Sequence, residues 1–224
     1  KPAKGPLALL KKLRGSGKPG GSSGAGQMKM LRRLPKILRF IPGPAQDVRQ
    51  YFLTLQYWLS GSDDNVVDMI RGLIDRYATG DRAALRGKLP ANAPREYPEV
   101  GVYHPDMPAR LTSDASLLPA VKNPAGTVGV LMLRSYLLGK DTGHYDGMIE
   151  MLEAQGLKVI PAFASGLDSR PAIDAYFIKD GQPSVDVILN LTGFSLVGGP
   201  AYNDVNAAVE TLTKLNVPYI AAHP

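Results

Sequence analysis

The chain has 224 residues, of which 44% are hydrophobic and 21% are charged, and it contains no cysteine. This length supports one ordinary domain plus a smaller element, and the missing cysteine excludes a disulfide framework and cysteine-ligated metal sites. No apolar run approaches the roughly 18 residues that a membrane helix needs, so the sequence predicts a protein without a transmembrane segment.

The net charge of +6 is distributed unevenly along the chain. Residues 1–46 hold eleven of the 26 Lys and Arg and none of the 20 Asp and Glu, so the remaining 15 basic and 20 acidic residues give the rest of the chain −5. A basic arm on a mildly acidic body fits nucleic acid, anionic lipid or an acidic partner, or simply a solvated linker. No aromatic residue precedes Phe40 to stack on bases, so we expect no nucleic-acid partner.

Residues 1–27 are predicted to be a basic, flexible linker because they are dominated by glycine, serine and positive charge. The stretch Gly15-Ser-Gly-Lys-Pro-Gly20 matches G-x-G-x-x-G, but no strand precedes it and no helix follows it. Gly17-Lys18 also fails as a P-loop, since Pro19 occupies the hydroxyl position. We therefore expect that this chain does not bind ATP itself.

Residues 28–86 are predicted to contain a helical hairpin. Pro44 suits the first turn of one helix, Gly61 ends it, and Ser62 caps a second helix whose first turn carries Asp63 and Asp64. Apolar residues recur at helical spacing in both helices and predict two buried stripes: Val48, Tyr51, Phe52, Leu55, Trp58 and Leu59, then Val66, Val67, Ile70, Leu73, Ile74 and Tyr77. The aromatic residues Tyr51, Tyr57 and Trp58 of the first helix could hold a flat cofactor, but a packed core is the favoured interpretation.

Residues 87–125 hold seven prolines, a density incompatible with a helix or a central strand. We predict an extended connector with an edge strand at Val100–Tyr103.

Residues 126–224 are predicted to form an α/β domain. Four aliphatic runs alternate with helical patterns, and strands that are apolar on both faces indicate a parallel sheet flanked by helices. The predicted strands are Thr127–Leu133, Leu157–Pro161, Val185–Leu191 and one beginning at Val217, with helices at His144–Gln155, Ala172–Phe177 and Asn203–Leu215. This corresponds to a truncated half of a Rossmann or flavodoxin-like fold. Because the chain starts at Lys1 and stops at His223-Pro224, we expect a fragment of a longer protein.

Such folds bind ligands at the carboxyl ends of their strands. The candidate ligand-binding residues are therefore those that follow the predicted strands: Arg134, Ser135, Thr192, Ser195, Gly198 and Gly199. The glycine-rich loop at residues 192–200 precedes a helix, so its amides can hold an anion; equally, the loop can need glycine only for its geometry. Arg134 can bind a carboxylate or form an ion pair with Asp141 or Asp146.

Three histidines are the remaining candidates for chemistry. His144 lies between Asp141 and Asp146 and is a weak metal-ligand candidate, but Asp141 or Thr142 is also a natural helix cap there. His104 and His223 have no sequence neighbours that indicate a catalytic base. No Ser-His-Asp arrangement is visible, since Ser195 is not in G-x-S-x-G.

Several stretches together resemble the large (H) subunit of magnesium chelatase, and more distantly that of cobaltochelatase. The bacterial, bacteriochlorophyll-making branch is indicated by the run Arg32–Arg39 and the helix containing Asp47. The other matching stretches are residues 34–42, 45–49, 51–61, 97–98, 103–105, 134–137, 144–146, 159–166 and 191–203.

The resemblance implies one part of a ligase that forms nitrogen–metal bonds, inserting Mg²⁺ as substrate into protoporphyrin IX in an ATP-dependent step of (bacterio)chlorophyll biosynthesis. It implies that the large subunit binds the porphyrin in the bacterial cytoplasm while the partner I and D subunits use ATP. The family's suspected catalytic residues lie beyond this chain, so none is carried over and the fragment alone is expected to be inactive. The porphyrin propionates need cationic or amide partners, which Arg134 and the Gly198-Gly199 turn can supply. Alternatives are a non-enzymatic α/β ligand-binding or interaction module and a cobaltochelatase-type subunit.

Overall fold

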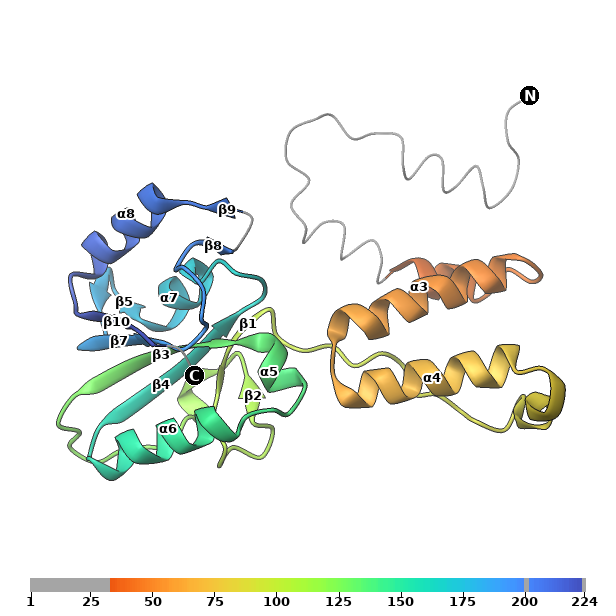
Figure 1. The fold of residues 1–224 in the computed structure, drawn as a ribbon, viewed down its shortest axis with the longest axis horizontal. Helices are drawn as coiled ribbons and strands as arrows, with labels where there is room; N and C mark the ends of the chain where they lie inside the picture. Colours follow the sequence, from red (N-terminus) through yellow and green to blue (C-terminus); the bar gives the residue numbers. More distant parts are fainter. Residues whose placement is uncertain (1–32, 200–201, 223–224) are drawn as a thin grey trace. The chain divides into compact units, whose positions relative to one another are not determined.

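The computed structural model describes residues 33–199 and 202–222, so the predicted linker 1–27 and His223 lie outside the described residues. The chain divides into a helical unit, Lys1–Arg95, and an α/β unit, Glu96–Pro224 (Figure 1). Within the described ranges, no helix is both long and apolar enough to cross a membrane.

The helical unit contains the predicted hairpin, formed by α3 (Ala45–Ser60) and α4 (Asp63–Tyr77), followed by the 3-10 helix η1 (Gly80–Leu85). Gly61 ends α3 with a φ of 61°, a conformation that costs glycine little because it has no Cβ. The Ser62 hydroxyl accepts a hydrogen bond from the Asn65 backbone N–H at 3.3 Å, which satisfies one of the free amides at the start of α4. The predicted hairpin is therefore confirmed.

A short helix at residues 33–38 packs on α3. Leu34 and Leu38 are buried against Ala45 and Phe52, which gives the unit a small apolar core. The Gln46 side chain donates to the Leu38 carbonyl at 2.9 Å, and Arg49 Nε donates to the Pro35 carbonyl at 3.2 Å. These bonds satisfy backbone carbonyls of the short helix and hold it on α3.

The predicted buried stripe of α4 is only partly confirmed, since Val66, Leu73 and Ile74 are half-buried. The two buried residues of α4 are the polar Asn65 and Asp68, whereas Val67, Ile70 and Tyr77 are 46%, 48% and 45% exposed. On α3, Tyr51 and Trp58 are exposed whereas Tyr57 is 3% exposed, so the aromatic stripe is only partly packed as a core. An extended backbone segment covers the side of α4 that carries Asn65 and Asp68. Val67, Ile70 and Tyr77 lie outside this contact and stay exposed to solvent.

That extended segment, residues 89–95, is held by polar side chains spaced along α4. Asp68 accepts hydrogen bonds from the backbone N–H and the side-chain amide of Asn92, at 3.2 and 3.1–3.2 Å. Asn65 exchanges two bonds with the backbone of Arg95, at 3.0 and 2.8 Å. Burying these polar residues is tolerated because their hydrogen-bonding groups find partners on the segment.

The α/β unit is built on a six-stranded sheet with the order β10-β7-β3-β4-β1-β2. Neighbours among β3, β4, β7 and β10 pair in parallel, whereas β1 is antiparallel to β4 and to β2. The strands are β1 (Val100–Tyr103), β2 (Leu111–Thr112), β3 (Thr127–Leu133), β4 (Lys158–Ala164), β7 (Val187–Asn190) and β10 (Tyr219–Ala221). The predicted α/β class with a mostly parallel sheet is confirmed.

Helices cover both faces of the sheet (Figure 1). One face packs against α5 (Arg134–Leu138) and α6 (Gly143–Ala154) through Leu137, Tyr145 and Ile149. The other packs against α7 (Arg170–Tyr176) and α8 (Val205–Leu215) through Ala172, Ile173 and Leu215. Smaller elements are η2 (Ala115–Leu117) and two hairpins, β5 (Ile178–Lys179) with β6 (Gln182–Pro183) and β8 (Gly198–Gly199) with β9 (Tyr202–Asn203).

Gly129, in the middle of β3, lets an aromatic ring lie directly on the sheet. A Cβ at this position would be 2.8 Å from Cζ of Phe177, which is fully buried. The glycine therefore makes room for the ring at the centre of the core.

Two predicted strands differ from the structure. Val100–Tyr103 is a strand, but it lies between β4 and β2 rather than at the edge of the sheet. The run predicted to end at Pro161 continues to Ala164, because Ala162, Phe163 and Ala164 pair with β1. The first difference comes from the antiparallel addition of β1, and the second from pairing of the same residues with β1 and with the end of β3; local patterning contains neither pairing.

Candidate functional site at the carboxyl edge of the sheet

The carboxyl ends of β3 and β7 form the topological switch point of the parallel strands. After β3 the chain enters α5 on one face of the sheet, and after β7 it leads to α8 on the other. Doubly wound folds bind ligands where neighbouring strands send their connections to opposite faces. The residues at this point are Leu133 and Arg134 on one side and Leu191 and Thr192 on the other.

The crevice at the switch point is nearly filled by protein side chains. It has a volume of about 10 Å³ and is lined by residues from the ends of β3 and β4 together with Leu167, Thr192 and Phe194, which leaves room for about one water molecule. β3 also passes into α5 without an intervening loop, since Leu133 is the N-cap of the helix. This crevice therefore holds no cradle for a phosphate or a flat ring.

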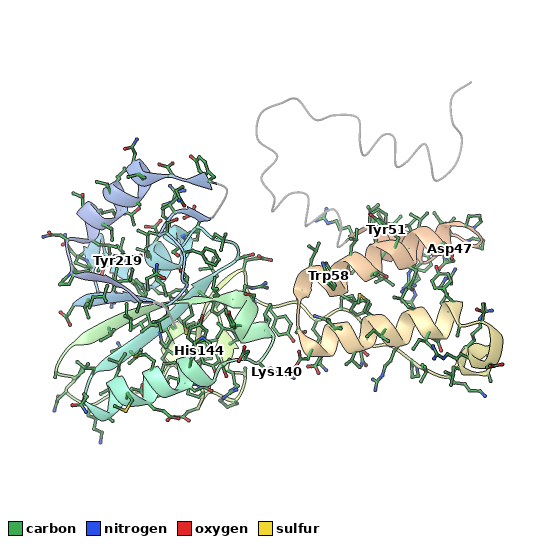
Figure 2. The ribbon with its side chains drawn as sticks, viewed as in Figure 1. Asp47, Tyr51, Trp58, Lys140, His144 and Tyr219 are labelled. Carbon is green, nitrogen blue, oxygen red and sulfur yellow. The ribbon has the colours of Figure 1, made fainter. Side chains whose placement is uncertain are left out.

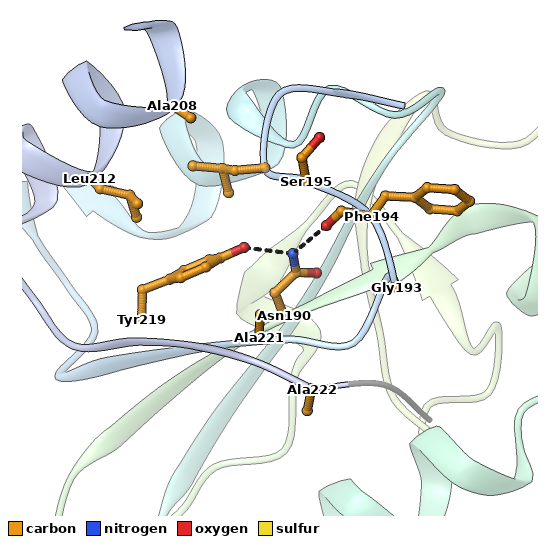
Figure 3. Close-up of a pocket in the computed structure, with 10 residues that line it drawn as sticks. Asn190, Gly193, Phe194, Ser195, Ala208, Leu212, Tyr219, Ala221 and Ala222 are labelled. Atoms are coloured by element: carbon orange, nitrogen blue, oxygen red, sulfur yellow. Dashed lines mark hydrogen bonds between the residues drawn. The ribbon is translucent and has the colours of Figure 1, made fainter. Parts of the chain in front are cut away.

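A larger cavity lies beside it, between the ends of β7 and β10 and the helix α8 (Figure 3). Its volume is about 410 Å³, which falls in the lower part of the range for small-molecule pockets. Most of its lining is apolar, contributed by Phe194, Leu196, Ala208, Leu212, Ala221 and Ala222, and the rest comes from Asn190, Gly193, Ser195 and Tyr219. We call it the Asn190 cavity.

The polar end of the Asn190 cavity is organised by one buried amide. Asn190 is 2% exposed, and its Nδ2 donates to the Tyr219 hydroxyl at 2.7 Å and to the Phe194 carbonyl at 3.1 Å (Figure 3). Its Oδ1 accepts from the Thr192 N–H at 2.9 Å. Because the Tyr219 oxygen accepts from Asn190, the hydroxyl proton can point into the cavity toward a ligand acceptor.

Arg134 lies at the predicted edge, where its guanidinium binds backbone carbonyls. Nε donates to the Pro98 carbonyl at 2.8 Å and Nη2 to the Tyr97 carbonyl at 3.2 Å. Ser135 follows it as an exposed residue in α5. Arg134 thus anchors the chain that enters β1. The sequence had suggested a carboxylate ligand or an ion pair with Asp141 or Asp146, and neither interpretation includes these backbone carbonyls.

The other candidates surround the loop after β7. Thr192 lines the small crevice, whereas Ser195 lines the Asn190 cavity. Gly198 donates its N–H to the Leu167 carbonyl at 3.1 Å, and a Cβ on Gly199 would be 2.1 Å from Leu167 Cδ1. The two glycines therefore permit close packing of the β8–β9 hairpin, and the Gly198 amide already has a protein acceptor.

The described histidines have structural surroundings. His104 is 1% exposed, and its Nε2 lies 3.1 Å from Glu153 Oε1 while its Nδ1 accepts from the Asp106 N–H at 3.2 Å. The His144 ring packs on Tyr145 with centroids 3.9 Å apart, and its buried Nε2 has no hydrogen-bond partner. Across residues 33–199 and 202–222, no group of three or more His, Cys, Asp or Glu side chains could hold a metal ion.

Thr142 is the N-cap residue of α6 by position, although its side chain makes no capping bond to the backbone. Its hydroxyl instead donates to Asp146 Oδ2 at 2.9 Å, and Asp146 Oδ1 accepts from the Tyr103 hydroxyl at 2.5 Å. Burial, followed by this bond to Asp146, raises the pKa of Tyr103 to about 12. Asp146 therefore joins α6 to β1.

The hydrogen-bonded pair Asn190 and Tyr219 was not among the residues predicted from the sequence. An amide inside the aliphatic run Val187–Asn190 was the available signal, because a polar residue at a buried strand end usually has a specific partner. That partner, Tyr219, comes from the neighbouring strand and is found only through the parallel pairing of β7 with β10.

Fold and site together define a doubly wound α/β protein with a ligand-sized cavity at the carboxyl edge of its sheet. A family model described as CobN/Magnesium Chelatase matches residues 55–224, and one described as a domain of unknown function matches residues 1–52. The chain belongs to the CobN/magnesium chelatase family.

Curated relatives agree with this membership. The chain is 59% identical to the H subunit of magnesium chelatase from Cereibacter sphaeroides and 58% identical to that from Rhodobacter capsulatus, in each case over 100% of the chain and 18% of the relative. It is 38% identical to the chloroplastic ChlH subunit of Oryza sativa subsp. japonica, over 88% of the chain and 15% of the relative. The resemblance to the bacterial branch is confirmed.

A solved structure supports the fold. The catalytic subunit of cobaltochelatase from Mycobacterium tuberculosis matches with a TM-score of 0.50 and 19% identity, over 78% of this chain and 13% of that one. At this identity the match supports the fold alone.

Proposed function

We propose that this chain is part of the porphyrin-binding subunit of a bacterial magnesium chelatase. The complete enzyme would insert Mg²⁺, its substrate, into protoporphyrin IX, with ATP used by partner I and D subunits in the cytoplasm. The observation that carries the proposal is 59% identity over all 224 residues to the H subunit of a magnesium chelatase. The chain spans 18% of that relative's length, so the activity is proposed for the assembly and not for these residues alone.

The reaction makes two chemical demands on the complete enzyme. Mg²⁺ must exchange water for other ligands, which favours several oxygen donors, and the porphyrin must lose two pyrrole protons to a base. No suitable group of three metal-binding side chains occurs in the described ranges. We therefore assign binding of the macrocycle, rather than metal transfer, to this part of the protein.

The Asn190 cavity supports such a binding role. Its aliphatic and aromatic lining suits the methyl- and vinyl-bearing edge of the macrocycle, whereas the propionates carry charge that this lining cannot stabilise. We further propose that Arg134, with Ser135, Thr192, Ser195 and the Gly198-Gly199 turn, faces the propionate side. Arg134 would then exchange a backbone carbonyl for a carboxylate, because its guanidinium already donates to Tyr97 and Pro98.

The proposal can be tested by filling the cavity in the complete large subunit. Ala208→Phe adds a ring to the cavity wall, while Val209→Phe adds the same ring at an exposed position of α8 as a control. We expect Ala208→Phe to weaken quenching of protoporphyrin IX fluorescence and Val209→Phe to leave it unchanged. Equal affinity in both variants would contradict the cavity assignment.

A second measurement separates a chelatase part from a non-enzymatic ligand-binding module. Magnesium insertion is followed with partner I and D subunits, Mg²⁺ and ATP, using the complete large subunit with and without Ala208→Phe. Loss of insertion in parallel with porphyrin affinity supports the chelatase role. The chain by itself is expected neither to hydrolyse ATP nor to insert Mg²⁺, and insertion above a buffer control would refute this expectation.

A further inference from the structure

One side of the helical hairpin presents large apolar side chains to solvent. Tyr51 and Trp58 of α3 are 61% and 66% exposed, and Ile70 and Tyr77 of α4 are 48% and 45% exposed. Residues spaced by seven lie on the same face of a helix, so each helix contributes one apolar stripe. We call these four residues the open face of the hairpin.

The two stripes border the same side of the hairpin. Asp47 accepts hydrogen bonds from Arg76 Nη2 and from the Tyr77 hydroxyl, both at 2.8 Å, so the start of α3 lies beside the end of α4. Tyr51 follows Asp47 by one turn on the same face of α3 (Figure 2). The other side of the hairpin is already covered, since Asn65 and Asp68 bind the segment 89–95.

Exposed aromatic and aliphatic side chains gathered in this way indicate a surface that another segment covers. Residues 1–32, which lie outside the described residues, include Leu7, Leu10 and Leu13 at a spacing of three, with Lys11, Lys12 and Arg14 beside them. Apolar anchors at helical spacing are the pattern by which a segment binds an apolar groove.

The reach of residues 1–32 favours this segment over a separate partner. Residues 15–32 comprise 18 residues, and a glycine-rich chain of that length spans about 23 Å. This span is similar to the roughly 24 Å length of a 16-residue helix such as α3. A tether of this length gives an effective concentration of about 1 mM.

We propose that residues Leu7–Arg14 dock on the open face and cover Trp58. Residues 15–32 then act as the tether, and the basic arm serves its own chain rather than nucleic acid. If the contact is apolar, replacing the leucines by charged residues should release the segment. The same charge introduced into the tether should leave it docked.

Trp58 is the chain's single tryptophan, so its fluorescence reports directly on the open face. We compare the 224-residue chain with Leu10→Glu/Leu13→Glu, and use Ser22→Glu/Ser23→Glu as a control with the same change in charge. We expect the double leucine variant to show red-shifted emission and stronger acrylamide quenching, because release of the segment would return Trp58 to its 66% exposure. The serine variant should match the parent.

Ile70→Glu, on the open face itself, should expose Trp58 to the same extent as the leucine variant. As a control for folding, circular dichroism at helical wavelengths should be unchanged in all variants. Parent emission that does not change on serial dilution supports docking within one chain. A change on dilution would show a second copy as the occupant and overturn the proposal. Equal quenching in the parent and the leucine variant, whether strong or weak, would overturn it as well.

Discussion

Arg134 Nε lies 2.8 Å from the carbonyl oxygen of Pro98, so the residue that follows β3 holds the chain that enters β1. Val100, the first residue of β1, is paired with Ala164 at the end of β4. The bond therefore ties the carboxyl ends of β3 and β4 to the amino end of β1.

Arg134→Leu should destabilise the α/β unit. The substitution removes the charged donor for two backbone carbonyls, a loss of about 1–3 kcal/mol in the free energy of unfolding. Urea denaturation measures this, with the exposed Lys122→Leu as control. In the complete large subunit, the same variant should bind protoporphyrin IX less tightly but bind its dimethyl ester as the parent does. Equal effects on both porphyrins would show that Arg134 is purely structural.

Gly129→Ala should destabilise the same unit by about 1–3 kcal/mol through overpacking, because its Cβ would be 2.8 Å from the Phe177 ring. Gly147→Ala is the matched control, since Gly147 lies in α6 and a Cβ added there would have no atom within 4 Å. The control should gain about 0.5–1 kcal/mol from helix propensity. Adding Phe177→Leu should recover part of the loss in the Gly129 variant. A neutral Gly129→Ala would mean that the ring can move aside.

Asp68→Ala should release the segment 89–95 from α4. The carboxylate is buried and accepts three hydrogen bonds from Asn92, so its removal leaves donors unpaired at a cost of about 1–3 kcal/mol. Hydrogen exchange of the Asn92 amide should accelerate in the variant. Asp68→Asn keeps an acceptor and should exchange more slowly than Asp68→Ala. Unchanged protection of Asn92 in both variants would contradict this role for Asp68.

Tyr103 should contribute to alkaline sensitivity. Its pKa is raised from 10.0 to about 12 by burial and by the bond to Asp146, so the unfolded chain releases this proton at lower pH than the folded protein. The contribution is fully present below pH 10 and is lost as the pH rises toward 12. Unfolding free energies of the parent and Tyr103→Phe, measured across this range, should converge as the pH rises. Parallel curves would contradict the assignment.

Local sequence determined much of the secondary structure. Ser62 with Asp63 and Asp64 marks the start of α4, and Gly61 marks the end of α3, because caps act through hydrogen bonds within one turn. The aliphatic run Thr127–Leu133 coincides with β3, since a strand covered on both faces needs apolar residues throughout. The candidate edge residues followed from the same parallel topology.

Tertiary contacts decided what the local pattern could not. Val100–Tyr103 became an inner strand and β4 continued past Pro161, because each depends on pairing between segments about sixty residues apart in sequence. The apolar stripe of α4 was predicted to be buried, yet periodicity shows only that a helix has an apolar face and not which surface meets it. The sequence by itself therefore determined the helical hairpin, the parallel strands and the family, whereas the tertiary structure decided that Asn190 meets Tyr219, that Arg134 holds Pro98 and that the hairpin keeps an open face. The physical reason is that capping and periodicity are local interactions, while cavities and exposed faces arise only where distant segments meet.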